Sequence, residues 1–143
     1  PVAVEKNWGR VQSNREENIL PLVMDLTNPS PMLGWANQER DALAPRGPVD
    51  CVMALALIHH LSISNNVPFS QVAAFLSSLG EHLIVEFVPK EDSQVQILLS
   101  TREDVFLDYD EASFEREFGR LFAILRKMPI DESKRALYLM RRR

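Results

Sequence analysis

The stretch that most constrains the fold of this chain is residues 49–58, which read VDCVMALALI. Asp50 is the one charged residue in this run. A continuous apolar run, rather than an alternation of apolar and polar residues, is typical of a strand covered on both faces. Helices cover both faces of parallel sheets in α/β proteins. We therefore predict an α/β fold in which residues 49–58 form an interior strand.

Four other apolar runs also predict strands. They are residues 19–26, 83–88, 121–128 and 135–141. Residues 129–134 separate the last two runs, and this gap is too short for the crossover that joins parallel strands. We therefore expect a mostly parallel sheet that ends in a C-terminal antiparallel hairpin.

Helical patterns lie between the predicted strands. Apolar residues at helical spacing run from Phe69 to Leu79, with Gly80 placed to end the helix. Further helices are predicted at residues 4–11, after Asp92 or Ser93, and after Asp110 as N-cap. In the last of these, the aromatic residues at 114 and 118 are interpreted as core. Residues 28–48 form a long connection with one helical turn at residues 38–43.

Composition limits the classes of function. A chain of 143 residues fits one domain, so we expect a single, partial domain over residues 1–143. The net charge of −4 argues against a broad nucleic-acid footprint. Cys51 is the single cysteine, which excludes an intrachain disulfide and suggests a cytoplasmic setting. No apolar run approaches the roughly 20 residues of a membrane span. The chain starts with Pro1, which suggests a processed or truncated product.

Polar groups collect where three predicted strands end. Asp25 ends the first, His59 and His60 follow the second, and Glu86 lies at the end of the third, shortly before Lys90. Ligands bind beyond the carboxyl ends of strands in open parallel sheets. The pattern therefore predicts one functional rim that carries these side chains.

Structural alternatives exist for each of these residues. Asp25 could cap its own turn, one histidine could be structural, and Glu86 could pair with Lys90 or Arg102. A metal site is disfavoured, because adjacent histidines on extended chain point apart and there is no His-x-x-x-His or paired-cysteine spacing. Cys51 is expected in mid-strand and inert, and neither a Gly-x-Ser-x-Gly elbow nor a phosphate-binding loop is present.

The chain resembles a bacterial class I S-adenosylmethionine-dependent methyltransferase family, some of whose members are described as nodulation-related. The resemblance rests on DLTNPSP at residues 25–31, Gly34-Trp35, DCVMALALIHHL at residues 50–61 and VEFVPKEDSQV at residues 85–95. It extends over essentially the whole chain and implies a Rossmann-like methyltransferase sheet closed by the terminal hairpin.

The resemblance also implies roles for individual residues. Asp25 and Leu26 would lie near the adenine of the cofactor, Ala56 and Leu57 beside the cofactor, and Glu86 and Lys90 near the acceptor. His59 or His60 would be the general base, because an imidazole titrates near neutral pH. The acceptor would be a small molecule or a protein side chain that is methylated on oxygen or nitrogen.

One departure from the family pattern is large. The family's first two strands and glycine-rich loop should precede the strand at residues 19–26, and no Gly-x-Gly cluster occurs here. Without the missing strands, the apolar edge at residues 49–58 would be exposed and would invite pairing, including a homodimer through this edge. Direct pairing of residues 19–26 with 49–58, or mobility of residues 1–48, are the other expected results.

Two functions follow from this pattern. The first is methyl transfer by the intact protein, with the 143-residue chain inactive by itself. The alternative is a degenerate methyltransferase-fold domain that binds a partner and has no catalytic activity. The sequence does not specify the acceptor.

Overall fold

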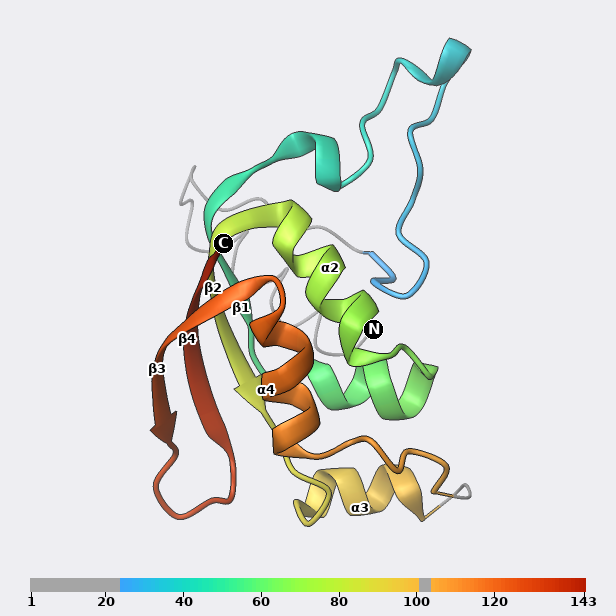
Figure 1. Cartoon of the computed structure of the whole chain (residues 1–143). Helices are drawn as coiled ribbons and strands as arrows, with labels where there is room; N and C mark the ends of the chain where they lie inside the picture. Colours follow the sequence, from blue (N-terminus) through green and yellow to red (C-terminus); the bar gives the residue numbers. More distant parts are fainter. Residues whose placement is uncertain (1–23, 101–103) are drawn as a thin grey trace, which may run out of the picture.

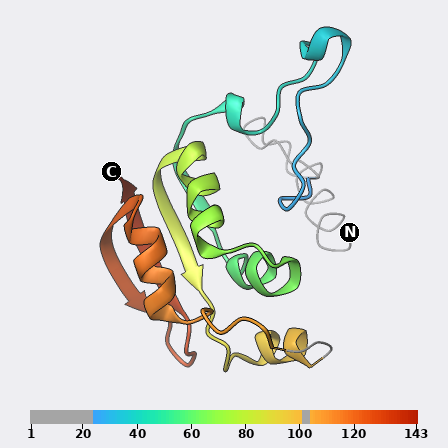
Figure 2. The same ribbon diagram turned by 45° about the vertical axis from the view of Figure 1, so that its right-hand side comes forward.

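The computed structural model describes residues 24–100 and 104–143, which form a mixed α/β structure (Figure 1). Its elements are, in chain order, η1 (Trp35–Asn37), η2 (Ala44–Arg46), β1 (Val49–Ala54), η3 (His60–Ser64), α2 (Phe69–Leu79), β2 (Gly80–Phe87), α3 (Ser93–Leu99), α4 (Glu111–Gly119), β3 (Phe122–Pro129) and β4 (Ala136–Arg142). The helices α2 and α4 lie over the same face of one sheet (Figures 1 and 2).

The described strands form a sheet in the order β1-β2-β4-β3. β1 and β2 are parallel, whereas β4 is antiparallel to both β2 and β3. The expected hairpin is confirmed, with β3 at the edge of the sheet. The expectation of a mostly parallel sheet is wrong for the described strands, because the hairpin provides half of them. Of the strand predicted at residues 19–26, residues 19–23 lie outside the described part, and residues 24–26 are not in a strand.

β1 is shorter than the apolar run that predicted it. The strand ends at Ala54, residues 55–57 form a loop, and the chain is helical from Ile58. Ile58 is nevertheless fully buried. The run stays apolar beyond the end of the strand because the strand and the following helical turn pack into the same core. The histidines therefore lie on a helical turn rather than on extended chain.

The three predicted helices between residues 69 and 119 are confirmed, together with their caps. Asp92 accepts a hydrogen bond from the backbone N–H of Gln94, and Asp110 accepts one from that of Ser113 at 2.7 Å. Gly80 ends α2, and a Cβ there would lie 2.9 Å from the carbonyl oxygen of Val49. The prediction of a helical turn at residues 38–43 is wrong, because the short helices η1 and η2 lie on either side of that segment. The helix predicted at residues 4–11 lies outside the described residues.

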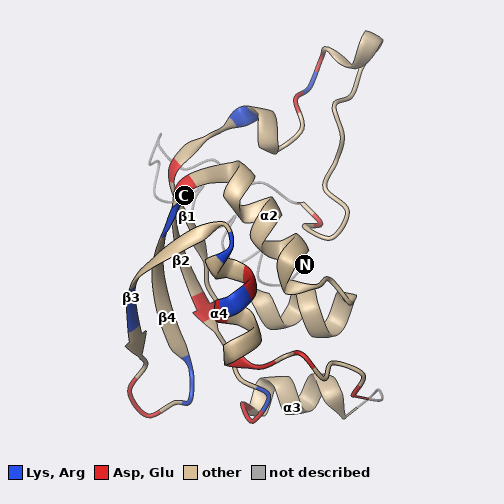
Figure 3. Ribbon diagram, in the orientation of Figure 1, with Lys and Arg blue, Asp and Glu red and all other residues tan. Residues whose placement is uncertain are grey.

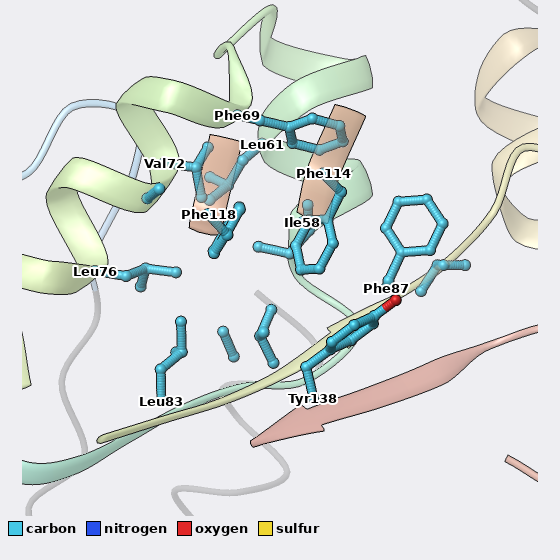
Figure 4. Close-up of a cluster of buried hydrophobic side chains, with 14 of the residues drawn as sticks. Ile58, Leu61, Phe69, Val72, Leu76, Leu83, Phe87, Phe114, Phe118 and Tyr138 are labelled. Carbon is cyan, nitrogen blue, oxygen red and sulfur yellow. The ribbon is translucent and has the colours of Figure 1, made fainter. Parts of the chain in front are cut away.

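The core is an aromatic cluster between the sheet and the two helices (Figure 4). Phe114 and Phe118 pack with ring centroids 4.3 Å apart, and Phe114 also contacts Tyr138 of β4. Their interpretation as core residues is confirmed. Helix α2 has no charged residue, whereas α4 carries both signs on its outer surface (Figure 3). The uncharged α2 is held against the sheet mainly by its buried apolar residues, with one hydrogen bond from Arg142 of β4 to the carbonyl of Ser77.

The opposite face of the sheet is apolar and open among the described residues. Val49 and Met53 of β1 are 48% and 63% exposed, and Leu125 and Met128 of β3 are also exposed. Cys51 lies in mid-strand as expected, but its side chain is exposed. The expectation that helices cover both faces of β1 is therefore wrong for the described residues. β1 also forms an edge of the described sheet, and the homodimer through this edge stays a prediction. None of the helices in the described residues is both long enough and apolar enough to cross a membrane.

The N-cap of α4 gives a direct test of this structure. Asp110→Ala should lower the free energy of unfolding by about 1 kcal/mol, because the first turn of α4 loses its side-chain acceptor. Urea unfolding measures the change, and Asp108→Ala, at an exposed position just before the cap, is the control. Equal effects of the two substitutions would contradict the assigned start of α4.

Candidate functional site

The candidate site is built around the loop that follows β1. Ala56 in this loop has a φ of 48°, a left-handed conformation that residues other than glycine seldom adopt. The backbone N–H of Ala56 donates a hydrogen bond of 2.8 Å to Oε2 of Glu86, which lies near the carboxyl end of β2. The buried carboxylate thus holds the loop in a conformation that the local sequence disfavours.

Arg135 fixes the carboxylate of Glu86 from the other side. Its Nη1 donates to Oε1 of Glu86 at 3.0 Å, while its Nε and Nη2 donate to the two carboxylate oxygens of Asp92 at 2.7 and 3.1 Å. The guanidinium lowers the pKa of Asp92, and that carboxylate in turn raises the pKa of Arg135. Bidentate pairs of this kind add geometric precision to charge attraction. One arginine therefore joins the end of β2, the start of α3 and the chain entering β4.

His59 is buried beside this network. Its side chain is 2% exposed, and Nδ1 has no hydrogen-bond partner among the described residues. Burial lowers its pKa to about 4, with further lowering by His60 and Arg135. The imidazole of His59 is therefore neutral at physiological pH and is suited to packing rather than to proton uptake.

His60 occupies the next position with a different environment. It is exposed, and its ring centroid lies 4.2 Å from that of His59. Because η3 is helical, the two rings share one turn instead of pointing to opposite sides of a strand. The ring of His60 can therefore be reached by a bound molecule, whereas that of His59 cannot.

The predicted rim is assembled only in part. The structure brings Ala56, His59 and Glu86 together at the carboxyl ends of the parallel pair β1–β2. Asp25 is exposed, and Oδ1 accepts hydrogen bonds from the backbone N–H and the hydroxyl of Thr27, so the carboxylate caps its own turn. These bonds lower the pKa of Asp25.

The other predicted residues lie as follows. Leu26 and Leu57 are half-buried and pack at the edge of the core. Lys90 forms an ion pair with Asp104 at 2.8 Å and not with Glu86. Within the described residues, no three His, Cys, Asp or Glu side chains gather in a way that could hold a metal ion.

Sequence reasoning missed Arg135 as a site residue and assigned Asp92 only as a cap. These residues are 43 positions apart, so no local spacing pattern connects them. Glu86 was expected to form a buried ion pair with Lys90 or Arg102 as one alternative. It forms one with Arg135 rather than with Lys90, and Arg102 lies outside the described residues.

Comparison with known proteins shows similarity to a curated protein. The chain is 41% identical over 143 residues to the nodulation protein NoeA of Rhizobium meliloti strain 1021. The match covers 99% of this chain and 30% of the relative, so the chain spans less than a third of the relative's length. No family model matches the chain, and no solved structure matches it.

Arg135 should be the main electrostatic contributor to stability at this site. Arg135→Met should lower the free energy of unfolding by about 2–3 kcal/mol, because two largely buried carboxylates lose their partner. Arg135→Lys should recover part of the loss, since an ammonium cannot form the bidentate pair. Urea unfolding measures both, with the exposed Arg126→Met as control. A loss equal to that of Arg126→Met would contradict the network.

Burial of neutral His59 predicts a specific pH dependence. Below pH 6.5 the unfolded chain takes up a proton at His59 that the folded chain excludes down to a pKa of about 4. The free energy of unfolding should therefore decrease as the pH is lowered from about 6.5 to about 4, by up to about 1.4 kcal/mol per pH unit.

His59→Gln should remove this component when urea unfolding is compared between about pH 7.5 and 5. The carboxyl groups with lowered pKa values, such as Asp92 and Asp110, lose their contribution to the free energy of unfolding only below this pH range, because they are protonated at lower pH. Identical pH slopes of the two proteins would show that His59 is not buried as a neutral group.

Proposed function

We propose that this chain is part of an S-adenosylmethionine-dependent methyltransferase and contributes the acceptor side of its active site. The observation that carries the proposal is the loop after β1, held in a left-handed conformation by Glu86 at the carboxyl ends of two parallel strands. Strained loops held by their surroundings occur preferentially at functional sites. The residues that carry the family resemblance include this loop and both histidines.

The environments of the two histidines give them different roles in this proposal. A general base works best when its pKa is near the working pH, and it must reach the acceptor. His59 satisfies neither condition, because it is buried and its pKa is held near 4. His60 is exposed on the same turn and is the proposed base. His59 would orient this turn by packing.

We do not expect the described residues to enclose the cofactor by themselves. Two cavities of about 580 and 340 Å³ open on the described surface, and neither is lined by Asp25, Leu26, Ala56 or Leu57. The N–H of Ala56 already donates to Glu86. S-adenosylmethionine would supply the reactive methyl group when bound. We propose that most of the cofactor contacts come from residues that correspond to the unmatched 70% of the Rhizobium meliloti relative.

The alternative, a partner-binding domain without catalytic activity, is favoured by one observation. The open face of the sheet presents apolar side chains, among them Met53 and Leu125. Large exposed apolar patches mark interaction sites in many proteins. Cofactor binding separates the two proposals, because a domain that only binds a partner needs no S-adenosylmethionine.

Calorimetry with S-adenosylhomocysteine tests the methyltransferase proposal. A chimera, in which these 143 residues replace the matching segment of the Rhizobium meliloti relative, should bind with micromolar affinity, and the isolated chain far more weakly. Absence of binding to both the chimera and the intact relative would contradict methyl transfer. Equal binding by the isolated chain would contradict the placement of most cofactor contacts elsewhere.

The role of His60 is tested in the same chimera. His60→Ala should lower turnover by about a hundredfold, with little change in affinity for S-adenosylhomocysteine, because a general base acts in the chemical step. Turnover is measured as release of S-adenosylhomocysteine, with an extract of Rhizobium meliloti cells as the source of acceptor. His82→Ala, on β2, is the matched control. Equal loss of turnover and binding would indicate a structural role.

A further inference from the structure

Residues 29–43 form an arm that projects away from the sheet and its two helices (Figures 1 and 2). Backbone hydrogen bonds close the tip of this arm, because Leu33 and Arg40 exchange N–H···O bonds of 3.0 and 3.1 Å. Inside the tip, Ala36 and Asn37 have φ values of 55° and 57°. Such left-handed conformations are seldom adopted by residues other than glycine, and they persist where the surroundings hold them. The tip is therefore a defined structure rather than an irregular loop.

Trp35 is presented at this tip. It begins η1, and it is 86% exposed, while Met32 on the approach to the tip is 44% exposed. Tryptophan is enriched among the residues that dominate binding energy at protein interfaces. The Gly34-Trp35 pair carries part of the family resemblance but lies outside the site around Ala56. A rigid tip that presents an indole ring is suited to insertion into an apolar cavity.

The larger cavity of the chain has such a lining. It measures about 580 Å³ and opens between the start of α2, residues 105–109 and one side of α4. Phe69 and Tyr109 line it, with ring centroids 5.2 Å apart. The hydroxyl of Tyr109 is already used, because it donates to the carbonyl of Val88. Leu107 also lines the cavity and is 86% exposed. The cavity therefore combines an aromatic wall with an open apolar residue.

The charged side chains of the lining cancel one another. Arg116 and Arg120 both pair with Glu117 on α4, and Asp108 provides a second carboxylate. A lining without net charge gives no preference for a small anion or cation, so the apolar wall determines which group binds. An indole suits this lining, because its ring is uncharged and its N–H needs an acceptor when buried. The exposed Asp108 is an acceptor for that N–H.

The arm and the α4 side of the cavity also have opposite charges. Glu39, Arg40 and Asp41 are the charged residues of the arm and give it one excess negative charge. The α4 side has two guanidinium groups for one carboxylate, which gives it one excess positive charge. Charge attraction therefore favours an arm that lies beside α4 with Trp35 in the cavity.

The tip of the arm lies apart from the cavity of its own chain (Figures 1 and 2). We propose that Trp35 of one copy docks into this cavity of a second copy, and that the two copies do so reciprocally about a two-fold axis. Each arm and each cavity is then used once, and the assembly closes as a dimer. This contact differs from pairing through the edge of β1, which involves neither Trp35 nor the cavity. It does not depend on methyl transfer, because association is measured without cofactor.

Sedimentation equilibrium of the 143-residue chain tests the dimer. Trp35→Ala removes the docked ring from both halves and should raise the dissociation constant by at least about thirtyfold. Leu107→Lys, beside the docked ring, should give a similar loss. Both side chains are exposed in the single chain, so neither substitution should change the midpoint of urea unfolding. Leu125→Lys, at an exposed apolar position on β3 that does not line the cavity, is the matched control and should leave the dissociation constant unchanged.

A mixture of the two variants is the decisive test. Each variant alone lacks both contacts, whereas a mixed dimer keeps one contact, between Trp35 of the chain with Leu107→Lys and the unchanged cavity of the chain with Trp35→Ala. The mixture should therefore associate more tightly than either variant alone. Three results would overturn the proposal: a chain that stays monomeric up to about 1 mM, a dimer that Trp35→Ala does not weaken, or a mixture that associates no better than its components.

Discussion

The ion pairs of Arg135 with two carboxylates at the end of the sheet are the interaction on which the candidate site depends. Arg135 holds Glu86 and Asp92 at once, and Glu86 holds the backbone of Ala56. Removal of the guanidinium would leave two largely buried carboxylates near each other, so the arrangement is cooperative rather than a sum of separate pairs. The conformation of the loop after β1, and with it the direction in which η3 begins, therefore depends on one side chain, that of Arg135 immediately before β4.

The core explains why this network lies at the rim of the sheet. Aromatic side chains from α2, α4 and the sheet fill one face, and Glu86 lies outside this core cluster. The opposite face remains apolar and open among the described residues, which is costly for an isolated domain.

Local patterns predicted the helices and the hairpin well. The spacing of apolar residues and the caps Asp92 and Asp110 gave three helices, and the short gap before residue 135 gave the antiparallel turn. The end of β1 could not be predicted, because Ile58 is as apolar in its helical turn as it would be in a strand. The ion pair between Arg135 and Asp92 depends on tertiary structure alone. The parallel character was overestimated because the hairpin provides half of the described strands and residues 24–26 of the expected first strand are not in a strand.

The two adjacent histidines show how position separates identical side chains. His59 lies close enough to Arg135 that a positive charge on its ring would oppose the guanidinium, and this repulsion adds to the cost of burial in holding the pKa near 4. A neutral His59 therefore preserves the Arg135 network and, through Glu86, the loop. His60 is exposed on the same turn, so this turn presents one buried ring that is neutral and one ring that a bound molecule can reach. A general base at this turn is thus compatible with the network only at position 60.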